Sequence, residues 1–378
     1  MSEEALPAWC AVFAELPDPR IDRTKAHSLL DILTIAVCAV LSGADSFTEM
    51  ADYGRAKEGW LHTFPALPNG IPSHDTFGRV FALLDPVQLE QCFARWAQQG
   101  LGVGDTPHIA CDGKTLRRTH DRGKGKSALH LISAWATESG ISLGQRAVAD
   151  HENEMVALPA LLESVVVPGA VVTIDAIGCQ RQVAQTIRQR GGDYVLALKG
   201  NQPGLYEAVD YLFTDSARSG FAVERLQTDT TLDKGHGRLE RRQCWAIADP
   251  ALVRYLDPEG RWPGLQSVVL VTTQRTFGTT VQRERRYYLS SLPAQAKRLN
   301  TLVRNHWRIE NHLHWVLDVA FDEDQCRVRT GNADHNLALL RRLALSLLRR
   351  DRTSRAGVKG KRLQAAWDHD YLLHILTQ

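Results

Sequence analysis

The chain contains 378 residues, of which 44% are hydrophobic and 23% are charged, and its formal net charge is +2. This composition is typical of a globular protein with two or three domains, and the near-neutral total charge favours no class of partner. Its seven cysteines lack a C-x-x-C pair, which argues against a disulfide framework or a structural zinc site. The longest apolar stretch, residues 29–44, is shorter than the roughly 20 residues of a membrane span, and the acidic N-terminus lacks a signal-peptide pattern. We therefore expect a cytoplasmic protein without a membrane segment.

The N-terminal part of the chain is predicted to be an all-helical domain, residues 1–104. A buried helix is expected from residue 29, a second helix from 47 to roughly 62, and a loop rich in proline follows. Ser73 is placed to cap a third, short helix. Two helices around a turn could form a DNA-reading helix-turn-helix, but the long turn favours a simple helical packing unit.

Residues 106–200 alternate between strands and helices. Strands are predicted at 109–112, 128–137, 141–148, 171–175 and 194–198, with helices at 155–165 and 178–190. An antiparallel start followed by crossover units that add parallel strands is the strand order of the ribonuclease-H-like fold. In that fold the first and fourth strands are neighbours at the sheet centre. We therefore predict an α/β mixed-sheet catalytic domain, residues 105–350.

A β-rich insertion is predicted within this domain, at about 216–292. It follows a helix at 201–215 and contains strands at 221–227, 241–248, 267–274 and 283–289. From 294 to about 348 the pattern is helical again. The last residues, 351–378, are interpreted as a basic C-terminal tail.

Basic residues gather in two places. Segment 113–126 holds six basic side chains against one acid, and segment 330–362 holds nine against two. Such clusters in a balanced chain are a footprint for a polyanion. For either cluster alone, a solvated helix face or a charged tail is the favoured interpretation.

Three carboxylates carry the functional hypothesis. Asp112 and Asp175 each end a predicted buried strand, and Glu310 lies within a helical pattern far along the chain. Carboxylate oxygens are the ligands that Mg²⁺ prefers, and a pair of such ions can clamp both oxygens of a phosphoryl transfer. A single Asp at a strand end usually caps a turn, so the hypothesis depends on the three acids together.

Cations and amides lie close to these acids in sequence. Lys114 follows Asp112, and the loop Lys199-Gly200-Asn201-Gln202 should lie at the same sheet edge as Asp175. Segment 234–242, with its two glycines and four basic residues, suits a loop that tracks a nucleic-acid backbone. An ordinary surface turn or hairpin is the alternative for each.

The helix that carries Glu310 has a second interpretation. His306, Glu310 and His314 recur at a spacing of four residues and so share a predicted helical face. We rank Glu310 as a Mg²⁺ ligand first, the helix as purely structural second, and a zinc site built with the histidines third. Asp318 and Asp322 follow, and a solvated face is the default for both.

Several short segments in fixed order resemble the DDE transposases of bacterial insertion sequences, in particular the subgroup that includes the H-repeat-associated proteins. They are LDIL at 30–33, ACDGK at 110–114, TIDA at 173–176, LALKGNQ at 196–202, HGR at 236–238 with Glu240, YYLSSL at 287–292, HWRIEN at 306–311 and LHW at 313–315. The resemblance covers roughly residues 25–350. It implies a ribonuclease-H-like catalytic domain, an associated N-terminal domain, and DNA cleavage and strand transfer that depend on Mg²⁺ or Mn²⁺, with two ions at Asp112, Asp175 and Glu310.

The same resemblance implies double-stranded DNA as the partner, a homodimer in the synaptic complex, and a bacterial cytoplasmic protein that associates with the nucleoid through DNA. The candidate DNA contacts are Lys114, Arg117, Lys199, Asn201, His236, Arg238, Arg304, Arg308 and His314. Two alternatives remain open: a metal-dependent nuclease of the same fold, and a domesticated remnant that binds DNA without catalysis.

The resemblance is incomplete around Glu310. Many relatives in the wider superfamily carry Tyr seven residues before this Glu, Arg four before it and Lys seven after it. Here these positions hold Val303, His306 and Leu317. Arg304, Arg308 and His314 are candidates to replace the missing charges.

Overall fold

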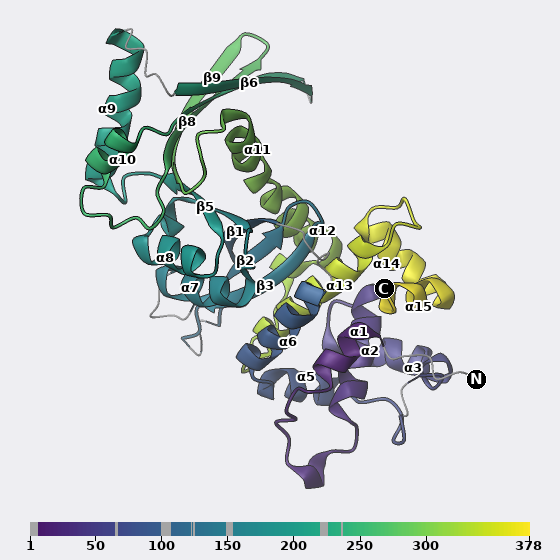
Figure 1. Cartoon of the computed structure of the whole chain (residues 1–378). Coiled ribbons are helices and arrows are strands. Elements are labelled where there is room, and N and C mark those ends of the chain that lie inside the picture. The colour runs from purple at the N-terminus through teal and green to yellow at the C-terminus, as the bar shows by residue number, and fades with distance from the viewer. Residues whose placement is uncertain are drawn as a thin grey trace. The chain divides into compact units, whose positions relative to one another are not determined.

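The computed structural model describes residues 7–64, 67–99, 107–121, 123, 125–148, 154–219, 226–235 and 237–378 (Figure 1). The chain divides into two compact units, each described by itself below. The first unit comprises Met1–Asp105, Gly113–His151 and Glu310–Gln378, and the second comprises Thr106–Asp112 and Glu152–Ile309. Helices and strands occur in both, which confirms the α/β class. No helix in the described part of the chain is both long and apolar enough to cross a membrane.

The N-terminal part of the first unit is helical, as predicted. Its helices are α1 (Ala8–Phe13), α2 (Leu29–Leu41), α3 (Phe47–Ala56), α4 (Glu58–Leu61), α5 (His74–Leu83) and α6 (Pro86–Gln99). Ser73 caps α5 as predicted, because its hydroxyl accepts from the backbone N–H of Thr76 at 3.3 Å. Ser46 and Glu49 form a capping box at the start of α3.

Helix α13 (Ala333–Arg350) is the central helix of the first unit. Its residues from Ala333 to Leu348 are buried, and it contacts α2, α5, α6 and β3. The amide of Asn336 donates to the carbonyls of Phe81 at 2.8 Å and Leu84 at 3.0 Å, which supplies partners for the C-terminal end of α5. A helix buried around its circumference needs such polar contacts because water does not reach it.

The predicted tail forms two helices, α14 (Val358–Trp367) and α15 (His369–Leu376). Lys361 and Arg362 are buried, and so are Arg341 and Arg342 on α13. For these four cations the predicted solvated face was wrong. The guanidinium of Arg362, for example, donates to the carbonyl of Val40 in the last turn of α2 at 2.9 Å and to that of Ala44, just after α2, at 3.1 Å.

Two strands of the first unit form a hairpin. Strands β2 (His130–Ala136) and β3 (Ile141–Val148) pair antiparallel around a turn at Gly140, whose φ of +72° suits glycine. Strand β1 (His108–Thr115) belongs to both units, since its residues from Gly113 onward lie in the first. These three strands begin and end within three residues of the prediction.

The second unit is built on one mixed sheet, with strand order β1-β4-β5-β9-β8-β7-β6. Strands β4 (Val171–Ile174) and β5 (Asp193–Leu198) are parallel to β1 and to each other. The crossovers are α7 (Glu154–Val165), followed by α8 (Arg181–Gln189) with the short 3-10 helix Ala176–Gly178 before it. The predicted adjacency of the first and fourth strands is confirmed.

The predicted insertion extends this sheet. After α9 (Pro203–Ser219) come β6 (Leu226–Gly235), β7 (Arg238–Ile247), α10 (Pro250–Leu256), β8 (Ser267–Phe277) and β9 (Thr280–Ser290), and β9 pairs antiparallel with β5. Strand β6 extends eight residues beyond the predicted strand at 221–227, whose first five residues lie outside the described part. Short α10 was not predicted.

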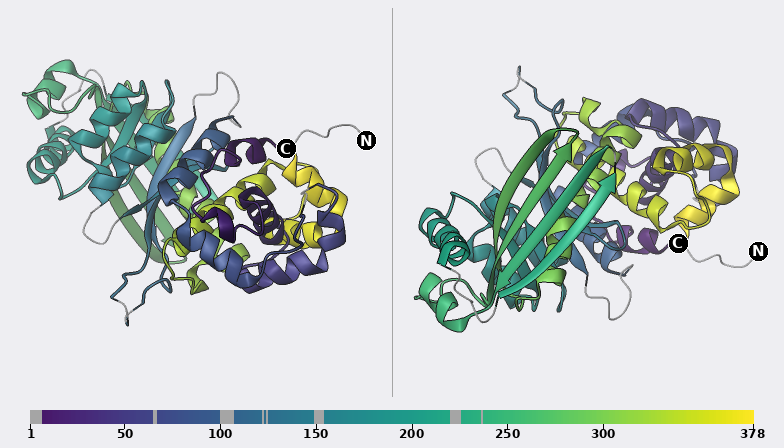
Figure 2. Two further views of the ribbon diagram at one scale, coloured as in Figure 1. Left: turned by 90° about the horizontal axis from the view of Figure 1, so that it is seen from below. Right: turned by 90° about the horizontal axis from the view of Figure 1, so that it is seen from above.

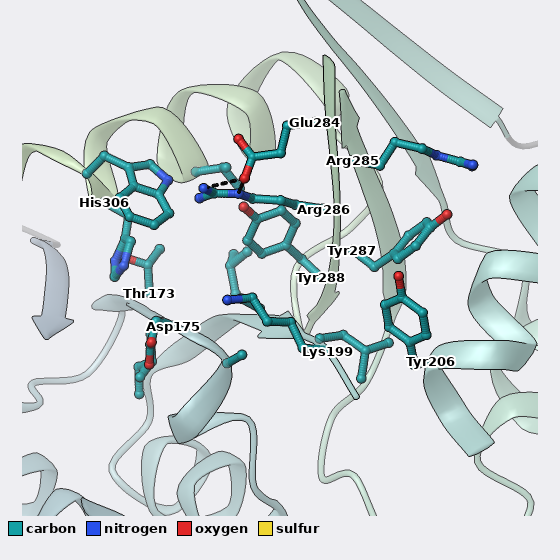
Figure 3. Close-up of a pocket in the computed structure, with 17 residues that line it drawn as sticks. Thr173, Asp175, Lys199, Tyr206, Glu284, Arg285, Arg286, Tyr287, Tyr288 and His306 are labelled. Carbon is teal, nitrogen blue, oxygen red and sulfur yellow. Dashed lines mark hydrogen bonds and ion pairs between the residues drawn. The ribbon is translucent and has the colours of Figure 1, made fainter. Parts of the chain in front are cut away.

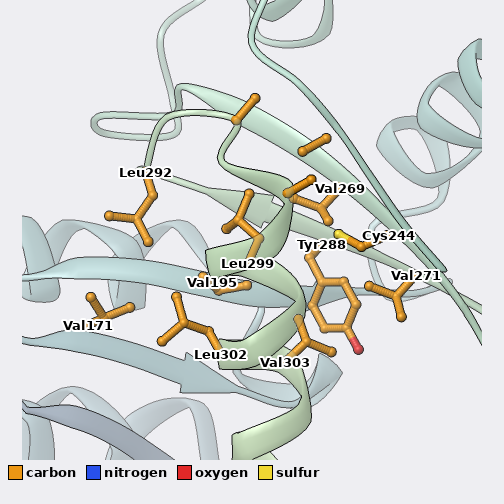
Figure 4. Close-up of a cluster of buried hydrophobic side chains, with 13 residues drawn as sticks. Val171, Val195, Cys244, Val269, Val271, Tyr288, Leu292, Leu299, Leu302 and Val303 are labelled. Atoms are coloured by element: carbon orange, nitrogen blue, oxygen red, sulfur yellow. The ribbon is translucent and has the colours of Figure 1, made fainter. Parts of the chain in front are cut away.

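Helix α11 (Ala296–His306) covers one face of the strands of the second unit (Figure 4). Its side chains Leu299 and Val303 pack with Val195, Val269 and Tyr288 in one buried cluster. Burial of such side chains contributes roughly 1.5–3 kcal/mol each. This packing fixes α11 against β4 and β5, the strands that lead to the candidate site.

The helical segments between Glu310 and Arg350 belong to the first unit. They are a π-helical turn at Glu310–His314, α12 (Trp315–Phe321), a 3-10 turn at Glu323–Gln325, and α13. The predicted helical character of 294–348 is therefore confirmed, with interruptions.

Candidate active site

Asp112 and Asp175 lie where the ladder between two neighbouring parallel strands ends. Asp175 directly follows β4, but β1 continues to Thr115, so the prediction that Asp112 ends its strand is wrong. The last pair in the register of β1 and β4 is Cys111 with Ile174, and each Asp is the next residue. The run Val171–Ile174 is short, β-branched and buried, as expected for the centre of a parallel sheet. The strand pairing therefore brings two of the three predicted acids to one edge of the sheet.

The carboxylate of Asp175 is held in place by a hydrogen bond, but its surroundings disfavour its ionised form. It accepts from the backbone N–H of Ile177 at 3.2 Å and so caps the turn Ala176–Gly178. Burial raises the pKa of Asp175, and the nearby carboxylate of Glu154 raises it further, while Lys199 opposes both effects. A bound cation would relieve this repulsion.

Two amides brace the loop that follows Asp175. Asn201 donates from Nδ2 to the carbonyl of Ala176 at 2.6 Å, and Gln202 donates from Nε2 to the carbonyl of Cys179 at 3.2 Å. A side chain on Gly178 would meet Ile174 at 2.3 Å, so this loop lies tightly against β4. Asn201, predicted as a DNA contact, thus acts here as support for the Asp175 loop.

We expect Asn201→Ala to lower any affinity of the Asp175 carboxylate for Mg²⁺ about 10- to 100-fold, the usual effect of losing a group that orients a ligand. The fold should survive, since one lost hydrogen bond costs only about 1 kcal/mol. The measurement is the thermal unfolding temperature of each variant at rising Mg²⁺ concentration. Thr301→Ala on α11, which loses a hydroxyl bonded to the carbonyl of Lys297 at 2.9 Å, is the control. Equal effects of both changes would contradict the supporting role of Asn201.

A pocket of about 130 Å³ opens beside Asp175 (Figure 3). It lies between β4, β5, β9, α9 and α11, and its lining includes Lys199, Arg286, Tyr288 and Trp307. The guanidinium of Arg286 lies over the ring of Trp307, 4.1 Å from its centroid, and pairs with Glu284 at 2.6 Å. Sequence reasoning did not single out Arg286; the segment YYLSSL that follows it was the available signal.

A buried hydrogen-bonded chain joins three elements next to this pocket. The hydroxyl of Thr173 on β4 lies 2.8 Å from Nε2 of His108 on β1 and 3.0 Å from Nδ1 of His306 on α11. Burial lowers the pKa of His108 to about 3 and that of His306 to about 4, so both rings are neutral at pH 7. The chain therefore ties the end of α11 to the strands that carry Asp112 and Asp175.

Glu310 is exposed and begins the π-helical turn of the first unit. Helix α11 ends at His306, and Glu310 and His314 lie in the π-helical turn that follows, where Glu310 is exposed and His314 is buried. The continuous regular helix that the shared face assumed is therefore wrong. His314 is buried, and burial together with Arg342 and Lys114 lowers its pKa to about 3. In the described part of the chain, no three acidic, histidine or cysteine side chains gather as a metal site.

Comparison with known proteins decides the family. The family model "Transposase DDE domain" matches residues 103–347, and the model "DDE_Tnp_1-associated" matches residues 10–97.

The chain belongs to the DDE transposase family. It is 34% identical to "H repeat-associated putative transposase YhhI" of Escherichia coli K12, with 96% of each chain covered. It is 37% identical to "Putative transposase YncI" of Escherichia coli O157:H7, covering 100% of this chain and 95% of the relative. A solved piggyBac transposase synaptic complex with hairpin DNA matches at a TM-score of 0.41 and 10% identity, over 98% of this chain and 76% of that one.

Lys114 of this DDE transposase lies in a network of buried charges rather than on the surface. Its ammonium pairs with Asp318 and, at 3.1 Å, with Glu323, whose other oxygen lies 2.8 Å from Arg342. The side chain of Lys114 is only 10% exposed. Asp318, expected on a solvated face, is thus a partner of Lys114.

The other basic residues predicted to contact DNA differ in their surroundings. Arg304 pairs with Asp233, and Arg238 lies 3.8 Å from Glu240. The side chain of Arg117 is 83% exposed, 3.6 Å from Asp324. Lys199 and Arg308 are exposed. His236 lies outside the described residues.

Proposed function

We propose that this DDE transposase acts on the ends of a bacterial insertion sequence, cleaving and joining DNA phosphodiester bonds with Mg²⁺ or Mn²⁺. The observation that carries the proposal is the register of β1 and β4, which brings Asp112 and Asp175 together at one sheet edge. Glu310 is the third acid by the family resemblance. The strand order and the crossovers support a ribonuclease-H-like catalytic domain at 105–350, with the insertion within it.

The two aspartates fit a hard divalent cation. Both offer carboxylate oxygens, the ligands of Mg²⁺. Burial and then the carboxylate of Glu154 raise the pKa of Asp175, so its ionised form gains from a nearby cation. Bound there, the ion would polarise phosphoryl oxygens and stabilise the charge that develops during phosphoryl transfer.

The surrounding residues position the aspartates and attract the substrate. Asn201 and Gln202 hold the loop after Asp175, and the chain from His108 to His306 holds α11 on the strands. Lys199, exposed at the end of β5 and lining the pocket with Asp175, supplies a cation for a DNA phosphate. Double-stranded DNA is the proposed partner, bound by a homodimer when two element ends are paired.

The test uses a supercoiled plasmid that carries the element ends. We expect the wild-type chain to nick it with Mg²⁺ or Mn²⁺, to produce joined donor–target molecules, and to lose both activities in EDTA and in the Asp112→Asn variant. Nicking without joined products would identify a nuclease instead. DNA binding without cleavage in either metal would identify a remnant that only binds DNA.

A further inference from the structure

The four strands of the insertion have two chemically different faces. Residues paired across neighbouring strands share a face, and side chains alternate between faces along each strand. Asp229 and Asp233 on β6 define one face, because Asn300 of α11 donates to Asp229 at 2.7 Å and Arg304 of α11 pairs with Asp233. We call this the α11 face and the opposite one the open face.

All four acidic residues of β6–β9 lie on the α11 face. The register places Asp229 beside Cys244, Asp233 beside Glu240, and Glu284 beside Thr273, all on this side. Its cations are compensated: Arg242 and Arg275 pair with Glu240 at 3.3 and 3.1 Å.

The open face of the four strands, by contrast, carries cations and no carboxylate. The register gives it Lys234, Arg241, Arg283 and Arg285. At the end of the open face that is nearer to β5, α9 covers β9. Tyr206 of α9 packs on Tyr287 of β9, and Asp210 of α9 lies 3.9 Å from Arg285 of β9. The part of the open face that α9 does not cover is its other end, which we call the outer end.

The outer end forms what we call the distal patch, namely Lys234, Arg241 and Arg283 with the amide of Gln274. All three cations are exposed, and none makes an ion pair with a described residue. Arg241, Gln274 and Arg283 lie directly opposite one another on β7, β8 and β9. The Cα atoms of the two arginines are therefore about 10 Å apart, two strand spacings. Figure 2, right, looks onto these strands, with the helices of the second unit lying behind or at the end of them.

We propose that the distal patch binds the phosphate backbone of duplex DNA. Three uncompensated cations on one face of a sheet repel one another and are stabilised by a polyanion, and a neutral amide between them can donate to phosphate oxygens. This inference rests on the proposed function, since it assumes a DNA substrate. It assigns the contact to residues other than Arg238 and Arg304, which have carboxylate partners on the α11 face.

The experiment measures binding of the full chain to a fluorescein-labelled duplex of random sequence by fluorescence anisotropy at several salt concentrations. Backbone binding needs no specific sequence, and each lost phosphate contact lowers the salt slope by about 0.9. The variant is Lys234→Gln, Arg241→Gln and Arg283→Gln combined. The matched control removes three exposed, unpaired cations elsewhere in the second unit: Arg181→Gln, Lys297→Gln and Arg298→Gln.

We expect the patch variant to bind more weakly, with a slope reduced by about 2 to 3, and the control to keep the wild-type slope. Equal losses in both variants, or unchanged binding by the patch variant, would overturn the assignment while leaving the proposed function intact. A wild-type chain that does not bind DNA would instead remove the proposed function. A change of oligomeric state in the patch variant without DNA, seen by light scattering, would assign the face to a second copy of the chain.

Discussion

Asp175→Asn is expected to abolish DNA cleavage and at the same time to stabilise the metal-free protein. An amide oxygen can still accept from the N–H of Ile177, so the turn is retained. It lacks the charge that holds a cation, and a loss of several kcal/mol of transition-state stabilisation lowers the rate about 1000-fold or more. The measurements are single-turnover nicking and thermal unfolding with and without Mg²⁺.

The sign of the stability effect follows from the pKa of Asp175. Burial and Glu154 raise that pKa, so the folded protein binds the proton more tightly than the unfolded chain does. Above the ordinary pKa of an aspartate, the ionised group therefore destabilises the fold, and the neutral amide removes this cost. Added Mg²⁺ should raise the melting temperature of the wild-type chain but not that of the variant.

Asp249→Asn is the matched control, because Asp249 caps α10 through N–H groups of Ala251 and Leu252 but lies at no predicted site. It should leave cleavage and the Mg²⁺ response unchanged. The metal-site hypothesis for Asp175 would fail if Asp175→Asn cleaved DNA at the wild-type rate, or if Mg²⁺ stabilised it as much as the wild-type chain.

Glu323→Gln is expected to lower the free energy of unfolding by about 3–5 kcal/mol, the usual cost of breaking a buried ion pair from one side. Glu323 is fully buried between Arg342 at 2.8 Å and Lys114 at 3.1 Å, and both cations would lose a charged partner. Urea unfolding gives the measurement. Glu259→Gln, which removes a surface pair with Arg261 at 3.2 Å, should cost less than about 1 kcal/mol.

Two further measurements separate the contribution of the Glu323 ion pairs to the free energy of unfolding from that of side-chain packing. Replacing Glu323 and Arg342 together by leucine should cost less than the sum of the single changes. The cations around Glu323 lower its pKa from 4.5 to about 2. The stabilisation by ionised Glu323 is therefore complete above pH 4.5 and is lost as the pH falls towards 2. The free energy of unfolding of Glu323→Gln should consequently fall less steeply between pH 4.5 and 2 than that of the wild-type chain. An equally steep fall in the variant and the wild-type chain would contradict the stabilising role of the Glu323 ion pairs.

The strands near the candidate site could be predicted because their signals are local. Val171–Ile174 is a β-branched apolar run, which is the pattern of a strand buried on both faces. Glycine and turn residues mark the turn that joins β2 and β3. The topology then placed Asp112 and Asp175 on neighbouring strands without any long-range information. This part of the fold needs only the period of the side chains and the handedness of crossovers.

The buried cations could not be predicted, because what decides their burial is a partner far away in sequence. Lys114 meets Asp318 and Glu323 more than 200 residues later, and Arg362 donates to carbonyls near residue 40. A sequence window shows only an excess of positive charge, which looks the same for a solvated face and for a paired interior. The same holds for Asn201, whose carbonyl partner at Ala176 belongs to another loop.

The surroundings of Glu310 show a different limit. The prediction assumed one continuous helix from 294 to about 348, and nothing in the segment HWRIENHLH signals that α11 ends at His306 or that a π-helical turn follows. The role of Glu310 as a metal ligand therefore stays a prediction from the family resemblance, as do the homodimer and the domain limits.

The contacts of Arg362 bear on the order in which this protein can fold as it is made. Helix α2 leaves the ribosome among the first elements, whereas the guanidinium that satisfies the carbonyls of Val40 and Ala44 is synthesised more than 300 residues later. The carbonyl of Val40 also accepts from the backbone N–H of Gly43 at 3.3 Å, but that of Ala44 must keep its water until then, since burying it without a partner costs about 1–3 kcal/mol. A copy of the gene interrupted before α14 should therefore yield an incompletely folded product that proteases remove, rather than a stable fragment that competes with the intact protein.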